Sequence, residues 1–519
     1  MSKPLILFLT CPEHGQSNVH LAVISSILEH HPSSASIHLA SHPGLKPRCP
    51  SGVTFHTVES KDAFDTEDHN GKSPKKALYS VTYKPGLFPA LRAMCESFSL
   101  FHPEPASSYI STADSISALL DTLNPTLVVV DHMFDAARDA VLKGRWRSVR
   151  LSPNTVKDVA IDCQGWGIFK WPCFASGYPF PLPWYLFLPN TIGLILPIIC
   201  LNFSRTFASF NIARNKAGYP GVIPLYSSGG PFPTKVLCMS TPEADLPAII
   251  PKKIICCGPI LQAVSPLPDQ DPELDLWLAQ RPTILISLGS HLKLSHSYAT
   301  NLLRAISHLL SARSDVQVLW KLVPDGSYDY EAFSEEEGEL GREKEKWGER
   351  LKVVRWLKAE PFAIMNTGRV ICFVNHGGSN SYHEALATGV PQILLPAWLD
   401  CYDFASRVGY LRNGVWGNKF SAPSCSTLEL IRAFDKIIGL SPPTSSSSPP
   451  LLYRQRALEL QAIVTRNGTR RGRDVAAEVV WEEMEEGMMW GNKYEEDEGC
   501  MDEEGDSVMV DGEDGKIMV

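Results

Sequence analysis

A histidine, an asparagine and hydroxyl side chains follow one another closely in the segment His376-Gly-Gly-Ser-Asn-Ser381. All of these groups can donate hydrogen bonds to phosphate oxygens. The two glycines suit a turn that leads into a helix, where free backbone N–H groups and the positive end of the helix dipole attract anions. The segment therefore predicts a phosphate site, although a histidine with two glycines also occurs in ordinary tight turns.

The flanking sequence predicts the strand–loop–helix–strand unit that must position this turn. The apolar run over 370–374 is typical of a buried parallel strand. Residues 379–381 can cap a helix, which Gly389 ends. A second strand over 392–395 places Asp400 just past its carboxyl end, where ligands of open α/β sheets lie.

At this point the sequence resembles a known family. The segment from Trp356 to Ala405 is similar to the nucleotide-sugar signature of the UDP-dependent glycosyltransferases, of the glycosyltransferase family 1 type, in their fungal-like UDP-glucosyl and UDP-glucuronosyl form. The residues that match the family pattern W-x-x-Q, H-x-G-x-N-S-x-x-E, G-V-P and P-x-x-x-D-Q are Trp356, His376, Gly378, Asn380, Ser381, Glu384, Gly389-Val390-Pro391, Pro396 and Asp400. The chain departs from the pattern at Ala359, Ser379 and Cys401, which leaves the identity of the sugar open.

The resemblance implies roles for the matched positions. His376, Asn380 and Ser381 would hold the diphosphate of the donor, Glu384 would bind the ribose hydroxyls, and Asp400 would bind hydroxyls of the sugar. The donor is then a co-substrate, and the family uses neither a cofactor nor a metal site.

Three further positions complete the predicted nucleotide-sugar site. Trp356 and Gly378 belong to the signature itself. Ser290 follows Gly289 at the end of an apolar run over 283–288, and in the family a glycine–serine turn at this point approaches the diphosphate.

The catalytic base of the family is a histidine in a G-H-x-N turn after the first strand. The chain reads Glu13-His14-Gly-Gln-Ser-Asn18, so Gln16 occupies the place of that histidine. Glutamine accepts no proton at neutral pH, so either His14 is the base from a different loop geometry or the base is missing. His14 can equally be an ordinary exposed loop histidine.

Asp131 ends a strongly apolar run over 126–130, which predicts a buried strand. The family carries an aspartate at this strand end, where it orients the catalytic imidazole by accepting its other N–H. The predicted catalytic pair is therefore His14 and Asp131. An aspartate at a strand end is also a common helix N-cap.

Residues 179–203 contain no charged side chain and are rich in aromatic and aliphatic residues. The segment approaches the length needed to cross a bilayer, but prolines interrupt it. A half-inserted hairpin or an apolar wall of an acceptor pocket fits this pattern better than a spanning helix. Either reading favours a lipophilic acceptor, or peripheral or partly inserted contact with a membrane.

Composition narrows the class of protein. With 519 residues, two domains are expected. Residues 491–519 hold eleven acidic residues and two lysines, so the net charge of -9 belongs to this tail, and nothing indicates a nucleic-acid partner. The 13 cysteines form no C-x-x-C pair, and no targeting segment is visible, so we expect a reducing, cytoplasmic location with possible membrane association.

The resemblance implies an α/β protein of GT-B architecture, with two Rossmann-like domains facing across a cleft. We expect the following division of the chain: 1–257 as an N-terminal acceptor-binding domain, 258–280 as a linker, 281–440 as a C-terminal nucleotide-sugar-binding domain, 441–450 as a disordered Ser/Pro insertion, 451–490 as C-terminal helices and 491–519 as a disordered acidic tail.

The implied activity is inverting, metal-independent transfer of a hexose from a UDP-sugar to a hydroxyl of a lipophilic small molecule or lipid. Because Gln16 stands where a base is expected, a non-catalytic or membrane-recruiting nucleotide-sugar binder is the alternative.

Overall fold

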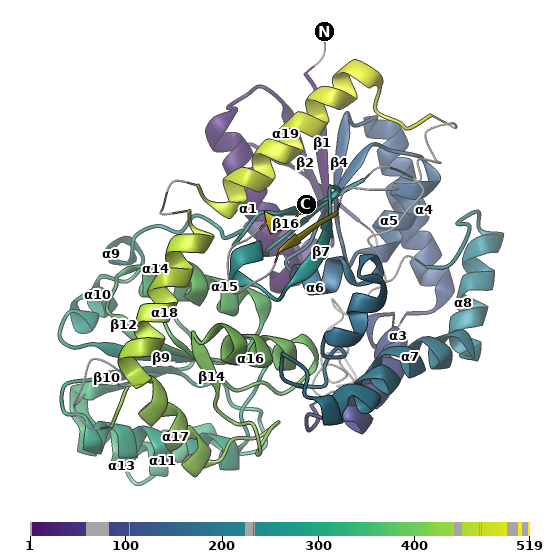
Figure 1. Cartoon of the computed structure of the whole chain (residues 1–519). Coiled ribbons are helices and arrows are strands. Elements are labelled where there is room, and N and C mark those ends of the chain that lie inside the picture. Colours follow the sequence, from purple (N-terminus) through teal and green to yellow (C-terminus); the bar gives the residue numbers. More distant parts are fainter. Residues whose placement is uncertain are drawn as a thin grey trace.

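Two parallel β-sheets, one in each half of the chain, organise the computed structural model (Figure 1). The structure describes residues 3–58, 82–102, 104–223, 232, 234–440, 449–466, 468, 470–495, 507–510 and 517–518.

In the described part of the chain, the first sheet has seven strands, all parallel. In spatial order these are β3 (Thr54–Thr57), β2 (Ser36–Ser41), β1 (Leu5–Leu9), β4 (Leu127–Asp131), β5 (Ser148–Leu151), β6 (Lys235–Cys238) and β8 (Ile254–Cys256). The helices of this half are α1 (His14–His30), α3 (Leu87–Phe101), α4 (Ala106–Leu123), α5 (Asp135–Lys143), α6 (Val156–Val159), α7 (Phe187–Asn202) and α8 (Arg205–Lys216).

The central strand β1 explains why this sheet is buried on both faces. Ile6 and Phe8 pack into a cluster that includes α1, whereas Leu7 and Leu9 pack on the other face against α4 and α5. Side chains alternate between the two faces of a strand, so a continuous apolar run fills both cores at once.

The second sheet repeats this arrangement with six parallel strands among the described residues. In spatial order these are β11 (Leu351–Val354), β10 (Gln317–Lys321), β9 (Thr283–Ser287), β12 (Val370–Asn375), β13 (Gln392–Leu394) and β14 (Gly414–Trp416). Its helices are α9 (Leu267–Gln270), α10 (Pro272–Leu278), α11 (His296–Ala312), α12 (Tyr330–Ser334), α13 (Glu339–Trp347), α14 (Pro361–Asn366), α15 (Ser379–Thr388), α16 (Leu399–Leu411) and α17 (Thr427–Ile437).

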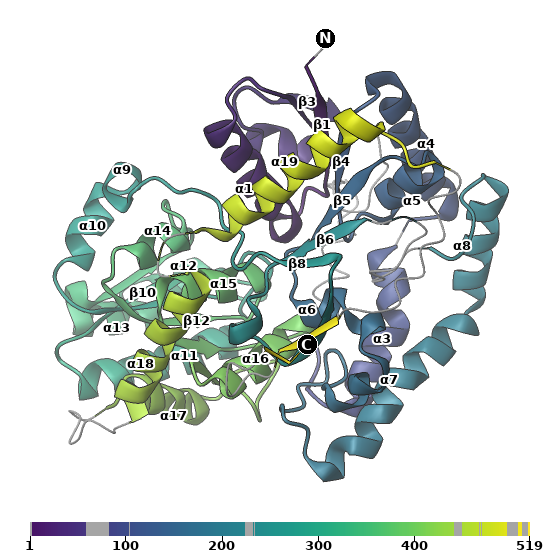
Figure 2. The ribbon, with the colours of Figure 1, turned by 45° about the horizontal axis from the view of Figure 1, so that its top comes forward.

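The chain crosses between the two halves twice. Residues 258–266 lead into the second half, and the return runs through α18 (Pro449–Val464), which packs on α15, to α19 (Gly472–Trp490), which packs on α1 (Figure 2). The two crossings touch at Gly472, where an added Cβ would lie 2.4 Å from the carbonyl oxygen of Pro259.

The expected linker over 258–280 is too long. Leu274, Trp277 and Leu278 of α10 are buried in a cluster with the second sheet, so this helix belongs to the second half. The Pro-rich composition of the region concealed a helix that Asp271 caps by accepting a hydrogen bond from the N–H of Leu274 (3.1 Å).

The expectation of disorder over the whole acidic tail is also wrong. Tyr494 is buried, β15 (Ser507–Val510) pairs antiparallel with β7 (Ala248–Pro251), and β16 (Ile517–Met518) pairs with β15. These short apolar runs interrupt the acidic sequence and add to the edge strand β7. The rest of the tail after residue 495, residues 441–448 of the Ser/Pro insertion and the polar segment 61–78 lie outside the described residues, and Pro449 already begins α18.

Candidate active site

The carboxyl ends of β9 and β12 carry the turn that the sequence singled out. The imidazole of His376 lies between two glycines, because a Cβ added to Gly289 or to Gly378 would approach the ring to 2.6 Å and 2.5 Å. Gly289 also has a positive φ of 78°. Both glycines are therefore required for the close approach of backbone to this ring.

The turn itself is fixed from below by Asn375. Its Oδ1 accepts a hydrogen bond from the N–H of Gly377 (2.8 Å), and its Nδ2 donates to Oε1 of Gln392 (3.1 Å) on the neighbouring strand. A positive φ of 86° at Gly377 then leads the chain into α15. The helix start, with Ser379 to Ser381, thus faces the same side as His376.

His376 is held as a neutral imidazole. Burial lowers its pKa to about 3, and the charges of His291 and Lys321 lower it further. Its Nδ1 is buried without a hydrogen-bond partner in the described part of the chain. A neutral ring beside a helix start can donate one N–H to an anion without the cost of a buried charge.

Lys321 brings a cation to the same edge of the sheet. It ends β10, pairs in register with Ser287 of β9, and is only 8% exposed. Its Nζ lies 4.1 Å from the ring centroid of Trp356, which is itself 61% exposed. Burial lowers the pKa of Lys321 to about 8, against the opposing charge of Glu360.

Two carboxyl groups of the predicted set are unusually easy to protonate. Burial and the charge of Glu360 raise the pKa of Glu384 to about 8. Burial, followed by the charges of Asp158 and Asp403, raises the pKa of Asp400 to about 7. Carboxyl pKa values shifted this far upward are typical of binding and catalytic sites.

Asp400 follows a strained residue. Leu399 has a φ of 36°, a conformation that costs a branched, bulky side chain on the order of 1 to 3 kcal/mol. Tyr83, from the first half of the chain, accepts a hydrogen bond from the N–H of Leu399 (3.0 Å). The backbone before Asp400 is therefore held by the opposite domain.

The predicted pair His14 and Asp131 does not form. Asp131 accepts hydrogen bonds from the hydroxyl of Thr10 (2.8 Å) and from the N–H groups of Cys11 (3.3 Å) and Met133 (2.9 Å), and no hydrogen bond joins it to His14, although both residues are described. Burial raises the pKa of Asp131 to about 6. The prediction was wrong because α1 begins at His14 itself, and this start directs the residue toward the second domain.

His14 instead meets the donor loops. Its carbonyl oxygen accepts a hydrogen bond from Nδ2 of Asn380 (3.4 Å), and the adjacent Glu13 pairs with His291 (3.3 Å). Burial and the charge of Arg48 lower the pKa of His14, so it is neutral at pH 7 and able to accept a proton. Gln16 has its Oε1 buried with no partner among the described residues.

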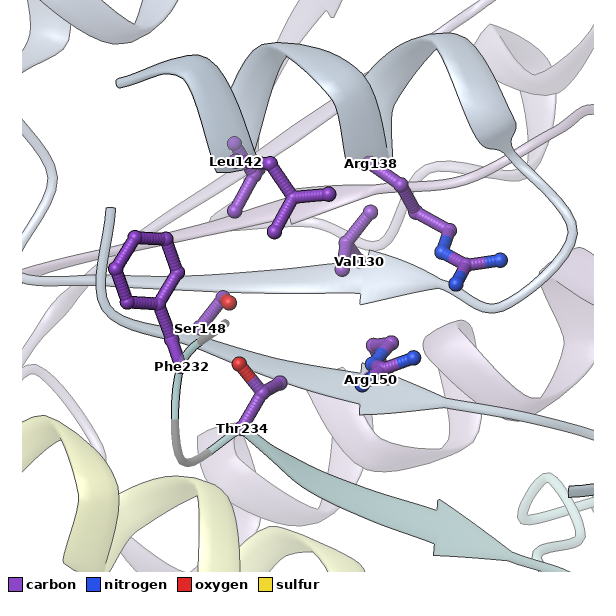
Figure 3. Close-up of a pocket in the computed structure, with 8 residues that line it drawn as sticks. Val130, Arg138, Leu142, Ser148, Arg150, Phe232 and Thr234 are labelled. Carbon is purple, nitrogen blue, oxygen red and sulfur yellow. The ribbon is translucent and has the colours of Figure 1, made fainter. Parts of the chain in front are cut away.

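The first sheet is electropositive beside Asp131. Figure 3 shows a cavity between α5 and β5 into which Arg138 and Arg150 both reach. Burial and the charge of Arg138 lower the pKa of Arg150 to about 9. Burial and both guanidinium groups lower the pKa of the neighbouring His132, which keeps that imidazole neutral.

Comparisons with known proteins agree with this geometry. The family described as "UDP-glucoronosyl and UDP-glucosyl transferase" matches residues 280–438. The glycosyltransferase sdnJ of Sordaria araneosa is 36% identical over 451 residues, which cover 82% of this chain and 85% of the relative. The chain belongs to the UDP-glycosyltransferase family.

Solved structures show that the glycosyltransferase has the expected GT-B architecture. The glycotransferase of kitacinnamycin aligns with a TM-score of 0.60 and 16% identity, over 93% of this chain and 100% of that chain. A UDP-glucosyltransferase from Polygonum tinctorium aligns with a TM-score of 0.61 and 14% identity, over 93% of this chain and 99% of that chain. At these identities the likeness concerns the fold.

Buried polar pairs join the two domains of the glycosyltransferase beside the donor loops. Lys157 pairs with Asp403 (2.8 Å), and Arg407 pairs with Asp245 and donates to the hydroxyl of Thr155 (2.8 Å). The domains therefore face each other in a closed arrangement, fixed by charges that none of the sequence motifs contains.

The structure thus brings together most of the residues predicted for the donor. His376 and Gly378 meet Gly289, the residue before the exposed Ser290, and Asn380 reaches the loop of the first domain. Ser381 lies in the first turn of α15 and Glu384 one turn later. Sequence reasoning missed Lys321 and His291, although both positions follow the rule that ligands lie at the carboxyl ends of parallel strands.

Proposed function

We propose that this UDP-glycosyltransferase transfers a hexose from a UDP-sugar to a hydroxyl of a lipophilic acceptor, with inversion of the anomeric configuration and without a metal ion. The observation that carries the proposal is the neutral imidazole of His376, seated between Gly289 and Gly378 at the start of α15 with the ammonium of Lys321 nearby. These groups form a preorganised site for an anionic leaving group.

The proposed step is a single displacement. The acceptor oxygen attacks the anomeric carbon as the bond to the β-phosphate oxygen of UDP breaks, so negative charge moves onto the diphosphate. The N–H groups at the start of α15, His376, Ser381 and Lys321 would stabilise that charge. Inversion follows because attack and departure occur on opposite faces of the sugar.

The remaining donor contacts follow from position. Glu384 would bind the ribose hydroxyls, and its raised pKa suits a carboxyl that can both donate and accept a hydrogen bond. Asp400, in the first turn of α16, would bind hydroxyls of the transferred sugar. Trp356 offers an exposed aromatic face near Lys321 for the base.

On the acceptor side we propose His14 as the base. It is neutral, and it lies on the first domain next to the donor loops. Asp131 would act on the loop rather than on the imidazole, because its oxygens hold Thr10 and the N–H of Cys11.

Two relatives support a lipophilic hydroxyl acceptor. The human 2-hydroxyacylsphingosine 1-beta-galactosyltransferase is 25% identical over 274 residues, which cover 52% of this chain and 41% of the relative. The Polygonum tinctorium enzyme is described as capable of glucosylating indoxyl. The first of these names a lipid and the second a small aromatic hydroxyl compound.

Incubation of the protein with UDP-glucose, UDP-galactose and UDP-N-acetylglucosamine, each with a phenol, a sterol and a long-chain alcohol, tests the proposal. We expect UDP release together with a glycoside whose anomeric proton coupling shows inversion, and we expect EDTA to leave the rate unchanged. A retained configuration or loss of activity with EDTA contradicts the proposed step. Donor binding without any glycoside across the panel favours the non-catalytic binder instead.

A further inference from the structure

The helix α7 presents a broad apolar face to solvent. Trp184 just before it is 89% exposed, Leu188 is 68% exposed, and Phe203 just after it is 84% exposed. The elements that pack against α7 extend this face, because Phe88 on α3 is 81% exposed and Trp166 is 88% exposed. Contiguous apolar surface of this kind marks an interaction site.

Residues 179–203 form a short turn and one helix rather than a hairpin, and that helix belongs to the folded domain. In the described part of the chain, Trp184–Asn202 is the one helix long and apolar enough to cross a membrane. Asn190 is fully buried, accepts a hydrogen bond from the N–H of Cys173 (2.6 Å) and donates to the carbonyl of Trp171 (2.8 Å). Gly193 packs against Cys173 so closely that a Cβ would come within 2.5 Å of its Sγ.

A spanning orientation would break these contacts, because the polar groups of Asn190 and its partners would lose each other in hydrocarbon. The helix instead lies along the outer margin of the first domain, on the side of α3 and away from α19 (Figures 1 and 2). Its outer face is available while its inner face stays packed.

The charge around α7 is one-sided. Residues 163–242 contain no aspartate and no glutamate, although the chain without its tail carries balanced charge. Within this stretch Lys170, Arg205 and Lys216 are exposed. Arg205 follows the helix directly, so cations flank the apolar face, and each exposed Lys or Arg near an anionic bilayer contributes about 1 kcal/mol of attraction.

We propose that the α7 face docks the protein peripherally on an anionic phospholipid surface, with its exposed aromatic and aliphatic side chains entering the boundary between headgroups and acyl chains. The segment that leads into α7 also touches the second domain, where Phe180 packs edge-on against Tyr410 (5.0 Å between ring centroids). Docking would therefore bring the edge of the cleft close to the lipid. That this delivers acceptors rests on the proposed function, whereas docking itself does not.

Flotation of the purified chain with vesicles tests the docking. Vesicles of phosphatidylcholine mixed with phosphatidylserine in equal parts should bind the protein, and vesicles of phosphatidylcholine alone should bind it more weakly. The double variant Trp184→Ser/Leu188→Ser should reduce binding on the order of tenfold or more, since each side chain loses apolar burial. Arg205→Gln should reduce it roughly fivefold on the anionic vesicles.

Matched controls lie on the second domain. Phe420→Ser removes an equally exposed aromatic residue, 87% exposed, and Lys436→Gln removes an exposed cation; neither should change binding. Equal binding to both vesicle types, or controls that lose as much as the α7 variants, overturns the proposal. So does a concentration-dependent dimer that the α7 double variant abolishes without any vesicle binding, because a second copy then covers the face. Flotation uses neither donor nor acceptor, so its outcome is independent of whether transfer occurs.

Discussion

Replacing Lys321 by methionine tests whether the cation at the end of β10 contacts the donor diphosphate. The ammonium is buried and faces Trp356, Glu360 and His376. Loss of a hydrogen bond to a charged group costs about 1.5 to 3 kcal/mol. We therefore expect UDP to bind roughly 10- to 100-fold more weakly to Lys321→Met at pH 7. The melting temperature should not fall, since methionine removes a buried charge while keeping most of the volume.

The pH dependence gives a sharper readout. In the free protein the pKa of Lys321 is about 8, so its charge is present below pH 8 and is lost as pH rises. A bound diphosphate favours the ammonium and raises its pKa toward the ordinary value, so binding above pH 8 takes up a proton. The Kd for UDP should rise about tenfold between pH 7 and pH 9 in the parent protein, and much less in Lys321→Met.

Calorimetry of UDP binding in buffers of different ionisation enthalpy measures both the affinity and the proton uptake. Lys352→Met is the matched control, because Lys352 lies on the adjacent strand β11, opposite Leu319. Glu384 has a pKa of about 8 and titrates in the same range, so Glu384→Gln must keep the slope. If Lys321→Met binds UDP with the parent affinity, or keeps the parent proton uptake, Lys321 does not contact the diphosphate.

Three further substitutions separate the parts of the site. Gly378→Ala should weaken UDP binding by about tenfold or more, because its Cβ would displace the ring of His376, whereas Gly409→Ala, with no atom within 4 Å of its Cβ, should bind UDP normally in the same titration. Asp400→Ala should weaken binding of the sugar nucleotide more than binding of UDP, and equal losses in the two titrations would contradict its assignment to the sugar. His14→Ala should lower kcat by about 100-fold or more while the Kd of the donor stays constant, and the acid limb of the parent kcat/KM profile should lie below pH 6.5, because the pKa of His14 is lowered; a profile unchanged by the substitution would exclude His14 as the base.

The donor turn could be predicted from sequence because its causes are local. The apolar run over 370–374 becomes β12, and the cap residues 379–381 begin α15. Gly389 ends that helix with a φ of 67°, as a helix-terminating glycine requires. Each of these features depends on residues within a few positions of one another, so pattern and structure agree.

The contacts between the domains could not be predicted in the same way. Arg407 meets Asp245 and Thr155, and Lys157 meets Asp403, across separations of 162 to 252 residues. No spacing rule links such positions. Lys321 was accessible in principle, since a lysine that ends an apolar strand in a parallel sheet lies at the ligand edge. The helix α10 was hidden by the prolines around it, although Asp271 and Pro272 are an ordinary helix start.

The first loop shows why the site had to be assembled from both domains. Sequence placed His14 beside Asp131, because both follow strands whose carboxyl ends meet at one edge. In the structure, Asp131 holds the loop through Thr10, while His14 opens α1 and is contacted by Asn380. His291, the residue after the predicted diphosphate contact Ser290, pairs with Glu13 (3.3 Å), the residue before His14. The positions proposed for the leaving group and for the base are thus neighbours of a single interdomain ion pair, so a change at the donor turn reaches the base through one contact. It follows that the acceptor is deprotonated in the closed arrangement, where the donor loops complete the setting of His14.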